Sequence, residues 1–206
     1  WQRVQDIPQA KPPAELVRPG APLQHGLEEL GIAGRGGSHE VVIAVGPAFG
    51  DALTETIGGL PHDRVLQELI TGIAEEGLTA RLVKVYQSAD LAFIGYAGAQ
   101  LSGSGIAIGL QSRGTTVIHR SDLAPLNNLE LFPQSPNLTL ESYRHIGRNA
   151  ARYAKGEAVQ PVPMRVDNWV RLRLIVKTML LHRREVEAID PNRPPTELAF
   201  DWEPEV

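Results

Sequence analysis

The sequence predicts an α/β protein in which helices flank a central, mostly parallel sheet of at least four strands. Residues 41–45 read Val-Val-Ile-Ala-Val and end at Gly46-Pro47, and such a continuous apolar run is typical of a strand buried on both faces. A second apolar run follows at residues 79–86, and the segment between the two runs has helical periodicity. A strand, a helix and a strand in this order favour a parallel, right-handed unit.

The composition limits the classes of function. With 206 residues, 42% of them hydrophobic, the chain can bury one sizeable core. The formal net charge of -4 argues against a nucleic-acid partner, and the absence of cysteine excludes disulfides, thiolate nucleophiles and iron–sulfur clusters in this chain. Because no apolar run is long enough to span a bilayer and the first residues do not resemble a signal peptide, we expect a soluble, unexported protein without a membrane partner.

Three regions are expected along the chain. Residues 1–38 are rich in proline and end in Gly-Arg-Gly-Gly-Ser, a composition that resists regular structure, so we expect an extended arm. Residues 39–188 are the expected α/β domain, and residues 189–206 are expected to form an acidic tail. The domain ends in a helix at about residues 168–187, although alternation at 170–174 leaves a strand open there.

Helices and strands alternate in the middle of the chain. Apolar residues recur at helical spacing over residues 63–77, where Asp63 can cap the start and Gly77 the end. The other elements expected here are a strand at 79–86, a short helix at 90–101, strands at 104–110 and 115–119, and a turn at 111–114 between these two strands.

The last helix of this region has two distinct faces. Small and apolar residues at helical spacing predict that it starts after Thr139 and stops at Gly156. Its opposite face carries Arg144, Arg148 and Arg152. Such a stripe either contacts phosphates or is a face that is solvated or paired with acidic side chains, and the negative net charge of the chain argues against phosphate binding.

Glycine-rich segments are candidates for a ligand loop, and each has a structural alternative. Residues 46–50 follow the first strand, where open α/β sheets bind ligands, but a tight turn explains them equally well. Residues 102–105, Ser-Gly-Ser-Gly, offer hydroxyls and amides but lack the third glycine of a dinucleotide motif. Gly109 and Gly114 have phosphate-loop spacing, yet Thr115 replaces the required lysine, which excludes a nucleotide hydrolase.

Arg113 lies in the glycine-flanked turn, where it is either a solvated side chain or a bidentate phosphate ligand. The six histidines fall at no metal-ligand spacing, and no serine lies in a nucleophile elbow. We therefore expect no metal site in this chain.

Four segments together resemble the medium subunit of diol and glycerol dehydratases. They are Asp90, residues 101–119 (LSGSGIAIGLQSRGTTVIH), residues 126–136 (LNNLELFPQSP) and residues 139–154 (TLESYRHIGRNAARYA). The likeness runs from residue 40 to about residue 184 without a large gap. Such a long collinear likeness is far more specific than any single glycine motif.

The resemblance implies a heterohexamer of two large, two medium and two small subunits, with a reactivating factor as a further partner. Adenosylcobalamin would lie between the large and medium subunits of this propanediol or glycerol dehydratase, a hydro-lyase. Because the radical chemistry belongs to the large subunit, the resemblance implies no catalytic residue in this chain. It also implies a cytoplasmic location, either free or inside a bacterial microcompartment.

The resemblance also implies particular cofactor-binding residues. Asp90 would accept a hydrogen bond from a corrin amide, and Arg113, at a position where the family often has lysine, would bind the nucleotide-loop phosphate. The other implied residues are Asn128, Leu131, Pro133 and Ser135, which would line the pocket of the lower base, dimethylbenzimidazole, with Ser102, Ser104 and Arg171 nearby.

One alternative is the small subunit of the dehydratase-reactivating chaperone, which has a similar fold but does not bind cobalamin. That identity predicts loss of the cofactor-facing residues, whereas Asp90, residues 102–105, Arg113 and residues 128–136 are all present. A nucleotide-binding regulatory domain is a third and weaker interpretation, because the phosphate-loop lysine and the third glycine are missing.

Overall fold

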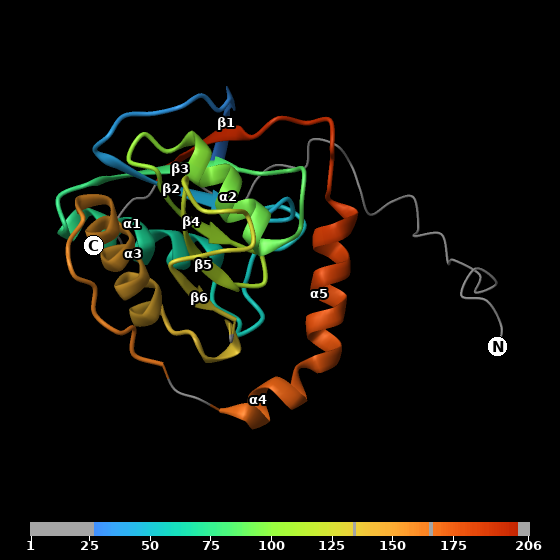
Figure 1. Cartoon of the computed structure of the whole chain (residues 1–206). Coiled ribbons are helices and arrows are strands. Elements are labelled where there is room, and N and C mark those ends of the chain that lie inside the picture. The colour runs from blue at the N-terminus through green and yellow to red at the C-terminus, as the bar shows by residue number, and fades with distance from the viewer. Residues whose placement is uncertain (1–26, 134, 165–166, 202–206) are drawn as a thin grey trace.

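The computed structural model describes residues 27–133, 135–164 and 167–201, which form one seven-stranded sheet with helices around it (Figure 1). The strands lie side by side in the order β1-β7-β3-β2-β4-β5-β6. They are β1 (Leu27–Ile32), β2 (Glu40–Val45), β3 (Thr79–Lys84), β4 (Ile106–Leu110), β5 (Thr116–Arg120), β6 (Glu130–Phe132) and β7 (Thr196–Phe200).

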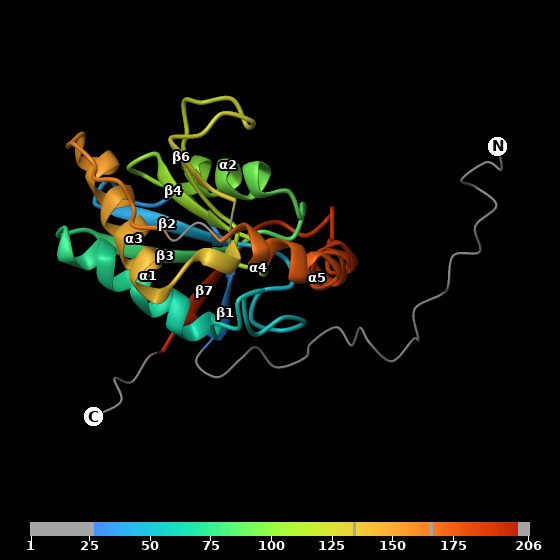
Figure 2. The same cartoon turned by 90° about the horizontal axis from the view of Figure 1, so that it is seen from below.

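Helices cover both faces of the sheet. One face packs against α1 (His62–Glu75) and α3 (Leu140–Lys155), and the other packs against α2 (Leu91–Leu101) (Figure 2). The remaining helices are a 3-10 turn, η2 (Ser135–Asn137), and two helices along one side of the molecule, α4 (Asn168–Arg173) and α5 (Ile175–Glu187). None of the helices in the described ranges has the length and apolarity needed to cross a membrane.

β2 lies at the parallel centre of the sheet, between β3 and β4. All six of its residues are buried, as expected for a strand with a helix layer on each face. The chain leaves β2 into α1 on one face, and it leaves β3 into α2 on the opposite face before returning as β4. The α/β class and the parallel strand–helix–strand unit are therefore confirmed.

The outer strands correct one detail of the prediction, because the whole sheet is mixed rather than mostly parallel. β4 and β5 are antiparallel, since they are joined by a short turn and a parallel connection needs a longer crossover. β6 is antiparallel to β5, and β7 is antiparallel to both β1 and β3.

Two strands come from segments that the sequence suggested were an irregular arm and a tail. β1 and β7 pair with each other from Leu27 opposite Phe200 to Ile32 opposite Thr196. Because β7 also pairs with β3, both strands extend the central sheet beyond residues 39–188. The part of the expected arm before residue 27 lies outside the described residues.

The helix ends largely follow the expected sequence signals. Asp90 caps α2 by accepting a hydrogen bond from the Ala92 N–H at 2.8 Å. In α3, Thr139 and Ser142 form a capping box, and Gly156 ends the helix with a φ of 71°. The start of α1 differs from the expectation, because the helix begins one residue before Asp63 and has no side-chain cap.

The C-terminal helical segment is interrupted once. α4 ends at Arg173 and α5 begins at Ile175, so the alternation over residues 170–174 belongs to helices and not to a strand. Of α5, all of whose residues are described, only Glu185 is buried. Its outer side and that of α4 expose Trp169, Leu172, Ile175, Val176, Met179, Leu180 and Val186.

The main core lies between the sheet and the α1–α3 pair, and a smaller core lies beneath α2. α1 and α3 approach closely through glycine: a Cβ on Gly147 would overlap the Leu69 carbonyl oxygen and lie 3.2 Å from the Gly72 Cα. Gly95 and Gly98 allow α2 a similar approach to the opposite face.

Candidate cofactor-binding site

The carboxyl ends of the three parallel strands meet at one edge of the sheet. The loops that follow β2, β3 and β4 lie there, and the C-terminal end of α5 reaches the same place through Glu185. In open α/β sheets this edge is the usual location of a ligand site.

The centre of this edge is the turn of residues 111–115 between β4 and β5. The Gly114 N–H donates to the Gln111 carbonyl at 2.7 Å, and Gly114 has a φ of 98°, which favours glycine. The Tyr143 hydroxyl donates to the Gly114 carbonyl at 2.8 Å, and the Ile57 N–H donates to the Arg113 carbonyl at 3.0 Å. These contacts hold the turn against α3 and against the loop after β2.

His62 joins the same turn to the loop after β2. Its Nδ1 accepts from the Gly50 N–H at 3.2 Å, so its Nε2 carries the proton and donates to the Ser112 carbonyl at 2.7 Å. The ring stacks on Phe49 with 3.8 Å between centroids. Burial lowers the pKa of His62 to about 4, so the imidazole is neutral and both of its nitrogens are used.

Glu185 holds Ser112 from the other side. Its carboxylate accepts from the Ser112 N–H at 3.0 Å and from the Ser112 hydroxyl at 2.6 Å. Burial raises the pKa of Glu185 to about 7, while donors on Ser112 and the backbone of Ala48 act in the opposite direction. The carboxylate lies directly against Gly46, where a Cβ would overlap Oε1.

Arg113 is half-buried beside this carboxylate and makes few contacts. Its Nε donates to the Gln111 Oε1 at 3.1 Å. Within the described part of the chain neither terminal nitrogen of the guanidinium has an acceptor, and burial lowers the pKa of Arg113. A half-buried guanidinium whose terminal N–H groups are not used by the described residues is suited to an anionic ligand such as a phosphate.

Asp90 lies at the same edge as Arg113. The link between them is Gln111, whose side-chain amide donates to the Ala89 carbonyl at 2.6 Å, next to Asp90. The Asp90 side chain is exposed, and its Oδ1 caps α2. A carboxylate has more acceptor positions than this one bond uses, so Asp90 can also accept from an external donor.

Ser102 and Ser104 lie elsewhere, at the C-terminal end of α2. Because α2 has 11 residues, this end is roughly 16 Å from the end that Asp90 caps. The two hydroxyls are 3.0 Å apart, and Ser104 Oγ also accepts from the Ile106 N–H at 3.2 Å. Ser102 is fully buried, so this loop is closed by its own hydrogen bonds.

The segments expected to line a lower-base pocket lie on the β6 side of the sheet. Asn128 and Pro133 are exposed on either side of β6, and Leu131 within β6 is 49% exposed. Ser135 begins η2, against which α4 with Arg171 packs. The side chains of Ser135 and Arg171 lie outside the described part of the structure.

The structure therefore brings Asp90 and Arg113 to one edge and does not bring the two serines to them. It also adds residues that the sequence reasoning missed, namely His62, Gln111, Ser112, Tyr143 and Glu185. Gln111 and Ser112 fall inside the expected turn, which was a usable signal. Glu185 has no local signal, because it resembles any charged residue of an exposed helix.

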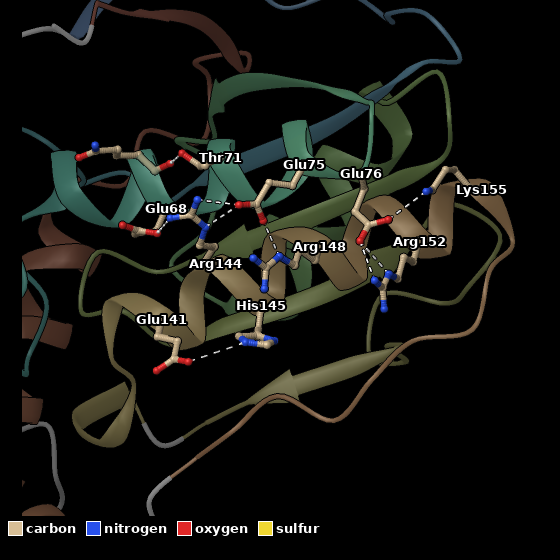
Figure 3. Close-up of polar contacts among 11 residues, drawn as sticks. Glu68, Thr71, Glu75, Glu76, Glu141, Arg144, His145, Arg148, Arg152 and Lys155 are labelled. Atoms are coloured by element: carbon tan, nitrogen blue, oxygen red, sulfur yellow. Dashed lines mark hydrogen bonds and ion pairs between the residues drawn. The ribbon is translucent and has the colours of Figure 1, made fainter. Parts of the chain in front are cut away.

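The arginine stripe of α3 is paired with acidic residues at the C-terminal end of α1 (Figure 3). Arg144 and Arg148 both bind Glu75, with nitrogen–oxygen distances of 2.6 and 2.5 Å. Arg152 and Lys155 bind Glu76 at 2.8 and 3.0 Å. These ion pairs account for the stripe. No group of three acidic or histidine side chains within the described ranges is arranged to hold a metal ion.

The fold and this edge define a class: an α/β protein whose loops gather at the carboxyl ends of parallel strands, where open α/β sheets usually bind ligands. The chain belongs to the dehydratase medium subunit family, whose model matches residues 46–160, more than half of the sequence. It is therefore a subunit of a dehydratase complex. The matched segment contains Asp90 and Arg113, whereas Arg171 and Glu185 lie beyond it.

Two solved structures are also similar. One, titled "Glycerol dehydratase reactivase", is 18% identical, with a TM-score of 0.48, and the match covers 62% of this chain and 100% of that one. The other, titled "Structure of diol dehydratase-reactivating factor complexed with ADP and Mg2+", is 20% identical, with a TM-score of 0.45, 61% coverage of this chain and 99% of that one. Likenesses at this level carry no argument about function.

Proposed function

We propose that this chain is the medium subunit of a diol or glycerol dehydratase and binds the lower side of adenosylcobalamin. In this proposal the large subunit carries the dehydration of a 1,2-diol to an aldehyde, and a small subunit completes the complex in the cytoplasm or in a microcompartment. The observation that carries the proposal is Arg113, a half-buried guanidinium with its terminal nitrogens unused by the described residues. Family membership supports the dehydratase assignment.

Arg113 binds the phosphate of the nucleotide loop in this proposal. The turn supports this role, because backbone groups on both sides of Arg113 are hydrogen-bonded to other elements and fix the position from which its side chain leaves the turn. A guanidinium presents two parallel N–H groups to a phosphate, so arginine can replace the lysine of relatives while keeping the charge.

Asp90 accepts a hydrogen bond from a corrin amide. Its exposed carboxylate, fixed at the start of α2, is a suitable acceptor, and Gln111 keeps it at the edge that also holds Arg113. Asn128, Leu131, Pro133 and Ser135 line the lower-base pocket, with Arg171 beside them. The exposed Leu131 supports this because a benzimidazole ring needs apolar contact. Ser102 and Ser104 are the weakest members of the set, because they lie at the far end of α2.

The cofactor, when bound, supplies the radical that the dehydration requires. The residues of this chain bind and orient the cofactor, and none of them acts on the substrate. Propanediol or glycerol preference therefore belongs to the large subunit.

The test is reconstitution of the complex from this chain and its partner subunits, followed by addition of cyanocobalamin, removal of unbound corrin and an absorbance spectrum. We expect a retained corrin spectrum. Arg113→Ala should weaken retention roughly 10- to 100-fold, as expected for a charge-assisted contact, and Asp90→Ala should weaken it less. The exposed Arg35 supplies the control, since Arg35→Ala removes the same charge away from the edge.

A stable complex with an ATPase-like partner and no retained corrin would instead identify the chain as the small subunit of the reactivating chaperone. Retained corrin that is insensitive to both Arg113→Ala and Asp90→Ala would show that the cofactor lies elsewhere on the complex.

A further inference from the structure

We infer that Glu185 is a positioning residue for cofactor binding: it fixes the turn that presents Arg113 and ties the placement of α5 to that turn. The inference rests on the proposed function, because it concerns how the phosphate-binding side chain is held. It adds a residue that lies outside the segment matched by the family model.

Ser112 is held through its N–H, its hydroxyl and its carbonyl. Its N–H and its hydroxyl both donate to Glu185, and its carbonyl accepts from His62. Ser112 is fully buried and directly precedes Arg113, so the direction in which the Arg113 side chain leaves the turn depends on these contacts. Removing the carboxylate leaves two buried donors of the turn without a partner.

A carboxylate matches the donors around this position better than an amide does. Ser112 donates to both oxygens, the hydroxyl to Oε1 and the N–H to Oε2, and the backbone of Ala48 adds a third bond. Glutamine has the same shape but replaces one acceptor by an NH₂ group, which would face a donor. Gly46 leaves the space that the carboxylate fills, because any Cβ there would overlap Oε1.

Glu185 holds the turn without using the hydrogen-bond donors of Arg113. Within the described part of the chain no hydrogen bond or ion pair joins the two side chains, so the terminal nitrogens of Arg113 stay available. The carboxylate still attracts the guanidinium through space.

Glu185 also joins α5 to the turn. Glu185 is the one buried residue of α5, and Lys177 adds only partly exposed contacts, to the Ile57 carbonyl at 3.2 Å and to Glu55 at 3.5 Å. Glu185 is therefore the buried side chain through which α5 contacts the edge. Displacing α5 would take Glu185 away from Ser112, while the contacts of the turn with His62, Tyr143 and Ile57 would remain.

The experiment separates phosphate binding from the rest of cofactor binding. The complete complex is reconstituted with the full-length chain, and the Kd is measured for cobinamide and for cobinamide phosphate, which differ only in the phosphate. The Kd for cobinamide divided by the Kd for cobinamide phosphate reports the phosphate contact alone. A general loss of packing would weaken the binding of both ligands equally and leave this ratio unchanged.

For Glu185→Gln we expect the ratio to fall roughly tenfold toward one, while the Kd for cobinamide changes little. Glu187→Gln is the matched control, because Glu187 lies on the same helix in an exposed i,i+4 pair with Arg183. Should Glu185→Gln fail to assemble, Ser112→Ala carries the same test, since it deletes only the 2.6 Å hydrogen bond and should lower the ratio partially.

The outcomes distinguish this inference from the proposed function. A ratio that collapses in Arg113→Ala but stays at the wild-type value in Glu185→Gln and Ser112→Ala overturns the inference and leaves the proposed function intact. A wild-type ratio near one, unaffected by Arg113→Ala, contradicts the phosphate role of Arg113 and with it the proposed function.

Discussion

Glu185 and His62 hold Ser112 from opposite sides, the carboxylate on its N–H and hydroxyl and the imidazole on its carbonyl. Burial shifts both side chains toward their neutral forms, raising the pKa of Glu185 to about 7 and lowering that of His62 to about 4. Because an acid and a base are affected, the two shifts change stability with pH in opposite directions.

The contribution of Glu185 to the free energy of unfolding should decrease as the pH rises. Its pKa is higher in the folded chain than the ordinary value of 4.5, so the contribution is complete below pH 4.5 and is lost as the pH rises through about 7. We expect the free energy of unfolding of wild type, measured relative to Glu185→Gln, to fall by about 2–3 kcal/mol between pH 5 and pH 8. Urea unfolding of both proteins at pH 5 and pH 8 measures this change. An equal difference between wild type and Glu185→Gln at the two pH values would contradict a raised pKa of Glu185.

The contribution of His62 to the free energy of unfolding should decrease as the pH falls. Its folded pKa lies below the ordinary value of 6.5, so the contribution is complete above pH 6.5 and is lost as the pH falls through about 4. His62→Phe keeps an aromatic ring against Phe49 but leaves the Gly50 N–H and the Ser112 carbonyl unpaired.

We expect His62→Phe to lower the free energy of unfolding by about 2–4 kcal/mol at pH 7.5, and by about 2 kcal/mol less than that at pH 5. The measurement is chemical unfolding, with His39→Ala at an exposed position as the control. A cost that does not change with pH would mean that His62 is not buried in its neutral form.

Gly46 and Glu185 should show strong coupling. Gly46→Ala alone places a methyl group on the carboxylate and should cost about 2–3 kcal/mol of unfolding free energy. In a Glu185→Ala background the same change should cost less than about 1 kcal/mol, because the overlapping side chain is gone. Equal costs in both backgrounds would show that the close contact at Gly46 is made by another group.

Gly147→Ala tests the contact between α1 and α3. Alanine favours a helix, yet here its methyl would overlap the Leu69 carbonyl, so we expect a net loss of about 2–3 kcal/mol in unfolding free energy. Gly37→Ala is the control, since no atom lies within 4 Å of its Cβ position. Thermal unfolding of the two variants compares them directly, and similar melting temperatures would contradict the close packing.

Glu75→Gln tests the ion pairs of Figure 3. The hydrogen bonds from Arg148 and Arg144 lower the pKa of Glu75 to about 2, so its contribution is present above pH 4.5 and is lost as the pH falls through 2. The pair is partly exposed, so we expect a cost of about 1 kcal/mol at low salt that decreases in 1 M NaCl. Glu28→Gln at an exposed strand position is the control, and a cost independent of salt would argue against electrostatics.

The sequence was sufficient where local chemistry decides the structure. α3 starts after Thr139 and ends at Gly156 as expected, because a cap and a left-handed glycine act on their immediate neighbours. β1 and β7 were not foreseen, since residues such as Glu28 and Glu197 weaken the strand pattern and the pairing joins segments far apart in sequence. Glu185 was missed for the same reason, because its burial depends on where α5 lies and not on its neighbours in the chain.

The place of β7 in the sheet has a consequence for synthesis of the chain. β7 lies between β1 and β3, so on the ribosome β1 has no neighbour, and the side of β3 stays open, until residues 196–200 have emerged. The nascent chain therefore carries an unpaired strand edge from the time β3 forms until β7 emerges, and such an edge invites pairing with another chain. Loss of these five residues would leave the finished protein in that same open state.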